Sequence, residues 1–117
     1  MTDLLIFEKD TPISVAVLQE LAEKRFGDMV KGVIDIETET VVLGAELHAD
    51  EEAILIQKGH AQAGLWGFNI YLDEDFPANI EFDSMINIRP SQGNRSRLVE
   101  DVQIRDRIIA ILEGFLK

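Results

Sequence analysis

Alternation of apolar and polar side chains with a period of two limits the fold of this chain more than any other feature. It is clearest in residues 65–72, where the apolar positions are Trp66, Phe68, Ile70 and Leu72. Residues 29–37, 40–48 and 80–89 show the same period. Successive side chains of a strand point to opposite faces, so each segment predicts a strand with one apolar face.

The segments 29–37 and 40–48 are close enough in sequence to form a hairpin. A tight connection would pair Ile34 with Leu43 on the apolar face. The same register would place Lys31 opposite Glu46 on the polar face, as a cross-strand ion pair.

Two helices are expected to flank the strands. The first would begin with Thr11 as its cap and Pro12 at its first position. The second would begin near Asp101, with a buried stripe formed by Ile104, Ile108, Ile111, Leu112 and Phe115. Residues 50–58 fit either a strand or a helix, and their short apolar run favours a strand.

Together these elements predict an α+β fold. The expected architecture has two layers: a mainly antiparallel meander sheet of four or five strands, with the N-terminal and C-terminal helices on one face. The length of 117 residues is typical of one domain, so residues 1–117 are expected to form a single α+β domain.

Composition narrows the classes of function. The chain has no cysteine, which excludes disulfides and thiolate chemistry and favours a reducing, cytoplasmic location. The net charge of −11 opposes broad nucleic-acid binding and attachment to anionic membranes. No metal-ligand spacing is present, and no cofactor is expected.

The positive charge of this acidic chain is concentrated near its C-terminal third. Residues 89–117 carry 6 basic and 4 acidic side chains, whereas residues 1–88 carry 5 basic and 18 acidic ones. The densest cluster, Arg89, Arg95 and Arg97, surrounds a turn-forming segment and is called the arginine loop (residues 89–97). Arginine forks bind phosphate and carboxylate, whereas pairing with nearby acids is the structural alternative. The ligand-binding candidates on this loop and the adjacent polar face are Arg89, Gln92, Asn94, Arg95, Asn87 and Asn69.

The polar face of the sheet is a second candidate site. It would carry Lys31, Asp35, Glu46, His48, Asn69, Tyr71, Asp83, Asn87 and Arg89. His48 is the candidate general acid or base because its ordinary pKa lies near neutrality, and Glu46, two residues earlier, would orient it. The alternative is that an uncovered sheet face is polar because it meets water.

Three blocks of sequence resemble a known family: Gly44 to Asp50, Leu65 to Tyr71 and Ile86 to Ser96. The chain is similar, from about Gly27 to Ser96, to an uncharacterised domain-of-unknown-function family of short prokaryotic proteins. This resemblance implies no activity, ligand or catalytic residue.

Three functions follow from these features. The first is a binding module that holds a small anionic ligand or an acidic partner segment through the arginine loop and the polar sheet face. The second is a structural or regulatory protein that forms a homodimer. The third is a hydrolase or transferase with His48 as acid or base and arginines as anion clamps. We expect the first.

Overall fold

A five-stranded antiparallel sheet forms the centre of the molecule. A computed structural model describes residues 4–116 and places the strands in the order β1-β3-β2-β4-β5. Their bounds are β1 Leu5–Phe7, β2 Met29–Asp35, β3 Thr40–Leu43, β4 Leu65–Tyr71 and β5 Ile80–Glu81. The predicted α+β class and antiparallel sheet are confirmed. The strand order is not that of a meander, because β4 pairs with β2 rather than with β3, and β1 adds to the edge at β3.

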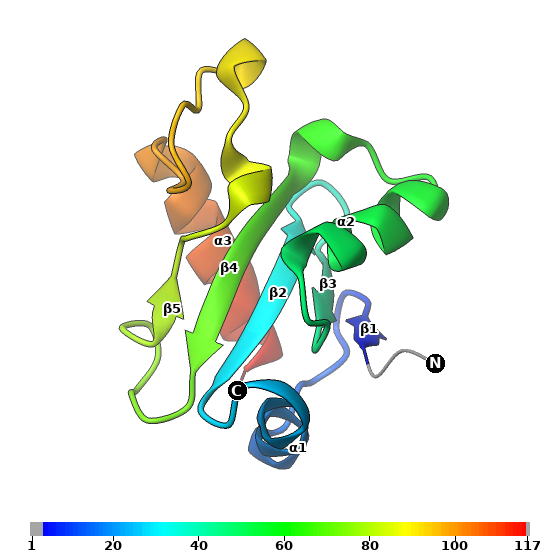
Figure 1. Cartoon of the computed structure of the whole chain (residues 1–117), viewed down its shortest axis with the longest axis vertical. Coiled ribbons are helices and arrows are strands. Elements are labelled where there is room, and N and C mark those ends of the chain that lie inside the picture. The colour runs from blue at the N-terminus through cyan, green and yellow to red at the C-terminus, as the bar shows by residue number, and fades with distance from the viewer. Residues whose placement is uncertain (1–3, 117) are drawn as a thin grey trace.

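Three α-helices pack on this sheet: α1 Val15–Arg25, α2 His48–Gln57 and α3 Val102–Phe115. In Figure 1, α3 crosses behind β4 and β2, whereas α2 lies in front of β2 and β3. The N-terminal and C-terminal helices α1 and α3 share one core, as predicted. Within residues 4–116, none of the helices has the length and apolar character needed to cross a membrane.

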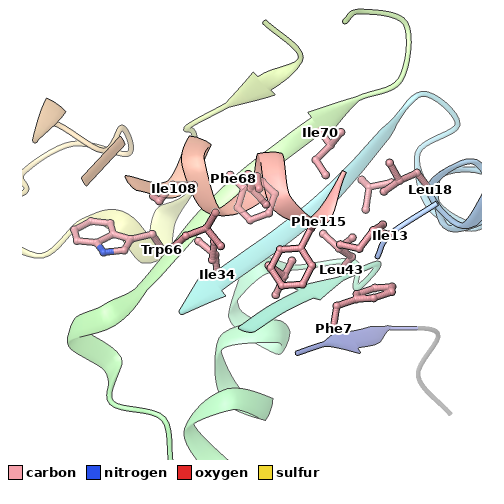
Figure 2. Close-up of a cluster of buried hydrophobic side chains, with 14 of the residues drawn as sticks. Phe7, Ile13, Leu18, Ile34, Leu43, Trp66, Phe68, Ile70, Ile108 and Phe115 are labelled. Carbon is pink, nitrogen blue, oxygen red and sulfur yellow. The ribbon is translucent and has the colours of Figure 1, made fainter. Parts of the chain in front are cut away.

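The main core lies between the sheet and helices α1 and α3. Figure 2 shows Trp66, Phe68 and Ile70 of β4 pointing toward the same layer as Ile108 and Phe115 of α3. The alternate residues of β4 are buried here, as the period of two predicts. The stripe predicted for α3 is also confirmed: Ile108, Ile111, Leu112 and Phe115 are buried, and Ile104 is partly buried.

A second, smaller core lies on the opposite face of the sheet, under α2. Val33, Val42, Leu55 and Leu65 are fully buried there. The preference for a strand at residues 50–58 was therefore wrong, since residues 48–57 form a helix. The short apolar run misled because a helix on this small core needs only one fully buried apolar residue, Leu55. The sheet face expected to be open is consequently covered over part of its area.

Helix α1 begins later than predicted. Its cap is Ser14, whose hydroxyl accepts a hydrogen bond from the Val17 backbone N–H (3.1 Å), so the expected start at Thr11 and Pro12 was wrong. Ile13 precedes this cap and is buried with Leu18 in the main core. This apolar pair across the start of the helix fixes the direction in which the chain enters it.

The β2–β3 hairpin has a register two residues away from the predicted one. Asp35 pairs with Thr40 and Gly32 pairs with Leu43. The loop begins at Asp35 because its carboxylate accepts the Glu37 backbone N–H (2.9 Å), which holds a tight turn. The predicted Lys31–Glu46 pair was wrong, because the Lys31 carbonyl accepts a hydrogen bond from the Gly44 N–H (3.2 Å).

The predicted strands 40–48 and 80–89 are both shorter in the structure. β3 ends at Leu43 because Gly44 has φ +102°, a conformation that turns the chain out of the sheet. β5 ends at Glu81. Beyond this point, the side chain of Asn87 makes the hydrogen bonds to β4 that the backbone of a longer β5 would make. Its Oδ1 accepts from Gly67 N–H (2.8 Å) and its Nδ2 donates to the Gly67 carbonyl (3.0 Å), so β4 keeps paired backbone groups.

Candidate functional site

A hollow of about 320 Å³ lies on the part of the sheet that α2 leaves uncovered. Strands β2, β4 and β5 form its floor, and the start of α2 forms one wall. The polar residues that line it are Lys31, His48, Asn69, Tyr71, Glu81, Asp83, Ser84 and Arg97. We call it the open-face hollow. Leu47 and Met85, which also line it, are exposed apolar residues.

His48 is the first residue of α2 and is only 7% exposed. Its Nε2 lies 2.8 Å from the carbonyl oxygen of Phe68. A carbonyl can only accept, so Nε2 carries the hydrogen, and the lone pair of the neutral ring is on Nδ1. Burial lowers the pKa of His48, and nearby Lys31 acts in the same direction; the Phe68 carbonyl and the Asn69 side chain oppose them. The ring is therefore neutral at neutral pH, with its tautomer fixed.

Asn69, Tyr71 and Glu81 form a hydrogen-bonded group on the floor of the hollow. Asn69 Nδ2 donates to Glu81 Oε1 (2.9 Å), and the Tyr71 hydroxyl donates to the same oxygen (3.0 Å). This bond to Glu81 raises the pKa of Tyr71, so its hydroxyl keeps its proton. The Asn69 Oδ1 is buried and has no hydrogen-bond partner within residues 4–116. An unpaired buried acceptor is costly, so this oxygen is available to a donor brought by a ligand.

Positive groups lie beside these acceptors. Arg97 Nε contacts Asp83 Oδ1 at 2.7 Å, so one arginine of the arginine loop reaches the rim of the hollow. Lys31 is half-buried in the floor, with its ammonium 5.3 Å from the centre of the Phe26 ring. The cap residue of α2, Leu47, offers no side-chain acceptor, so the first backbone N–H groups of the helix lack a side-chain cap.

The structure brings together five of the residues predicted for the polar face: Lys31, His48, Asn69, Tyr71 and Asp83. Glu46 is not among them. It is exposed, and it lines a different hollow with Arg25 and Asp50. The predicted strand would have aligned Glu46 with His48, but the chain turns out of the sheet at Gly44, before both residues.

Arg89 is buried between the beginning of β4 and the arginine loop. Its guanidinium lies over the Trp66 ring, 4.5 Å from the ring centre. It donates to the carbonyls of Ile86 (3.0 Å), Gln62 (2.8 Å) and Leu65. These bonds use donors that an anion would need, and they tie the loop to the sheet.

The other loop candidates hold the loop in shape. Asn94 is buried and donates to the carbonyls of Asn87 (2.7 Å), Ser96 (3.1 Å) and Leu98 (2.6 Å). Gln92 Nε2 donates to the carbonyl of Ala63 (3.1 Å). Arg95 is exposed, and Glu100 accepts its backbone N–H (3.0 Å). Among the six candidates, only Asn69 lines the open-face hollow.

Two acidic residues with distinctive environments were not predicted. Glu81 pairs across the strands with Asn69, and the alternation of residues 80–89 is the signal that could have placed it in the site. Glu51, within the segment 50–58, was not proposed for any site, but it is fully buried in α2. Within residues 4–116, no three His, Asp or Glu side chains are grouped so that they could hold a metal ion.

The fold and the hollow define a small antiparallel α+β protein with a mixed-charge hollow that contains a histidine. A family model described as "Protein of unknown function (DUF5674)" matches residues 6–115, and the chain belongs to that family. No curated protein and no solved structure matches it.

Proposed function

We propose that this protein binds a small anionic ligand in the open-face hollow. The ligand also carries a hydrogen-bond donor, as hydroxycarboxylates and phosphate monoesters of polyols do. The observation that supports this function most directly is the buried, unpartnered Oδ1 of Asn69 beside the neutral ring of His48. Both groups are acceptors, and a donor on the ligand would satisfy them.

The anionic end of the ligand is expected between Lys31 and the start of α2. An ammonium group and uncapped backbone N–H groups both attract negative charge, and the helix dipole adds to this attraction. The acidic residues of the hollow already have partners: Glu81 accepts from Asn69 and Tyr71, and Asp83 pairs with Arg97. Their charge is thus partly compensated, so it opposes an anion less than two free carboxylates would.

A thermal-shift screen tests this proposal. The probes are inorganic phosphate, glycerol phosphate and malate at millimolar concentration, each compared with sodium chloride at equal ionic strength. A ligand at about 100 times its Kd adds about 2.7 kcal/mol to the free energy of unfolding. We expect Lys31→Met to remove this gain. The control Lys24→Met, on the exposed side of α1, should keep it.

A different result would contradict the proposal. If no probe raises the melting temperature beyond the salt control, the small-ligand function is wrong, and the homodimer predicted from the sequence becomes the leading hypothesis. Size-exclusion chromatography with light scattering then measures whether two chains associate.

Arg95 separates the open-face hollow from the arginine loop as the binding site. Because Arg95 is exposed, Arg95→Ala should change the free energy of unfolding by about 0.5 kcal/mol or less. If the ligand lies in the hollow, this variant keeps the full ligand-induced shift. If the exposed face of the loop holds the anion, Arg95→Ala abolishes the shift and Lys31→Met does not.

A further inference from the structure

A second hollow, of about 330 Å³, lies at the opposite end of α2 from His48. Its polar lining comes from Glu8, Thr11, Thr40, Lys58 and His60. Lys58 and His60 follow the last residue of α2, and Thr40 begins β3. None of these residues belongs to the open-face hollow, so the second hollow is a separate place in the fold.

His60 is held in this hollow by a short contact with Asp35. The distance between His60 Nδ1 and Asp35 Oδ2 is 2.6 Å. Asp35 is the last residue of β2 and is only 2% exposed, and its other oxygen accepts the Glu37 N–H (2.9 Å). The two residues are 25 positions apart in sequence, so only the folded chain brings them together.

The carboxyl group of Asp35 is ionised at neutral pH. Burial alone raises the pKa of Asp35, but the hydrogen bonds from His60, the Glu37 N–H and the Thr38 hydroxyl outweigh burial and lower it. An ionised carboxylate only accepts hydrogen bonds, so His60 Nδ1 must be the donor. When the His60 ring carries a single proton, its lone pair is therefore on Nε2, which has no protein partner within residues 4–116.

We propose that this Asp35–His60 pair is a second, hydrolytic site, in which His60 Nε2 acts as a general base on water for the cleavage of a small carboxylic ester. Nε2 takes a proton from water as the water oxygen adds to the ester carbonyl. The resulting oxyanion collapses and breaks the bond to the alcohol oxygen, which receives the proton from His60. One ester and one water thus give one carboxylic acid and one alcohol.

The surroundings of the ring fit this chemistry. Asp35 fixes the tautomer and orientation of His60 and stabilises the imidazolium formed in the reaction, so Asp35 is a positioning residue. Lys58 supplies a positive charge to the same hollow, where it would attract the oxyanion. The hollow itself has room for a small substrate beside the ring.

The test is the hydrolysis of p-nitrophenyl acetate by the full-length protein, followed by release of p-nitrophenolate. We expect His60→Gln to lower the rate at least tenfold, since a positioned general base contributes about 10²–10⁴-fold. Asp35→Asn should also lower it. The control Lys24→Met, on α1 and outside the lining of this hollow, should keep the rate of the unmodified protein.

A second measurement tests the positioning role of Asp35. The ¹⁵N chemical shifts of His60 should show a protonated Nδ1 and an unprotonated Nε2 in the unmodified protein, and a mixture of tautomers in Asp35→Asn. Equal rates for the unmodified protein and His60→Gln would overturn the proposal. Because His60 is at the surface end of the pair, that comparison holds even if the buried Asp35→Asn variant does not fold.

Discussion

Glu51 has an ionisable side chain in an environment that disfavours charge. It is fully buried, its Oε2 accepts the Ala45 N–H (3.0 Å), and its Oε1 has no partner within residues 4–116. Burial raises the pKa of Glu51 well above its usual range, although the Ala45 N–H and Lys31 act in the opposite direction. The carboxyl group is thus favoured in its neutral form in the folded protein.

This raised pKa gives stability a definite dependence on pH. The folded state binds the Glu51 proton more tightly than the unfolded state does, so its contribution is complete below the unfolded pKa of about 4.5. That contribution is lost as the pH rises from there through the folded pKa. Each unit of the shift corresponds to about 1.4 kcal/mol.

We predict that Glu51→Gln raises the free energy of unfolding at pH 8 and flattens its decline between pH 5 and pH 8. The amide keeps an acceptor for the Ala45 N–H and carries no charge at any pH. Urea denaturation at several pH values measures the effect. The same substitution at the half-buried Glu52, one residue further along α2, is the control. Parallel pH profiles for Glu51→Gln and the unmodified protein would refute the prediction.

The three arginines of the arginine loop show which properties of single residues can be predicted from sequence. The sequence showed that Arg89, Arg95 and Arg97 are close together, but their roles depend on what each side chain meets. Arg89 is buried on Trp66, Arg97 reaches the open-face hollow, and Arg95 is exposed. No periodicity distinguishes these positions, because all three follow the end of regular strand structure at Glu81.

At the scale of the elements, α3 contributes a fully buried leucine to the main core. Leu112 is fully buried in the main core. We predict that Leu112→Ala lowers the free energy of unfolding by about 2–5 kcal/mol, the range for removing a buried leucine side chain. Thermal and urea melts measure the loss, and Glu113→Ala, on the exposed side of the same helix, is the control. A loss below about 0.5 kcal/mol would mean that α3 adds little to the core.

Elements with long, uninterrupted patterns were predictable from the sequence. The apolar pattern is long enough in β2, β4 and α3 to assign one face of each element to the core. In the structure that face is the one that is buried in the main core. Elements decided by local bonds were not predictable. The hairpin register depends on the Asp35 carboxylate, and the short β5 depends on Asn87 replacing a strand backbone.

Only those residues of the candidate site that lie on strands could be predicted from the sequence. Lys31, Asn69 and Tyr71 were expected on the polar face because side chains alternate along strands, and they share the hollow. His48 reaches the same hollow from the start of α2, a helix where the sequence pattern favoured a strand. The right residue was thus proposed with the wrong neighbour, Glu46.

At the scale of the whole molecule, both hollows lie on one face of the sheet. Lys31 and Asp35 occupy the same face of β2, four residues apart, which is roughly 13 Å along a strand. The ten-residue α2 spans roughly 15 Å between them, with His48 at its beginning and His60 just after its end. The four-residue core under α2 separates the two sites.

This core is much smaller than the one that holds α1 and α3. Local opening costs less free energy where fewer apolar contacts are lost, so amide hydrogens of α2 should exchange with solvent faster than those of α3 and β4. Hydrogen–deuterium exchange with mass spectrometry measures this order. Equal protection of α2 and α3 would contradict it.

The contacts of His48 and His60 both depend on the position of α2. When α2 separates from the sheet, the hydrogen bond between His48 and the Phe68 carbonyl breaks, and so does the one between His60 and Asp35. A single opening equilibrium therefore disrupts both sites. Leu55→Ala weakens the packing of α2 on the small core, although Leu55 lines neither hollow. This substitution should therefore reduce ligand binding in the open-face hollow and ester cleavage in the second hollow by the same fraction.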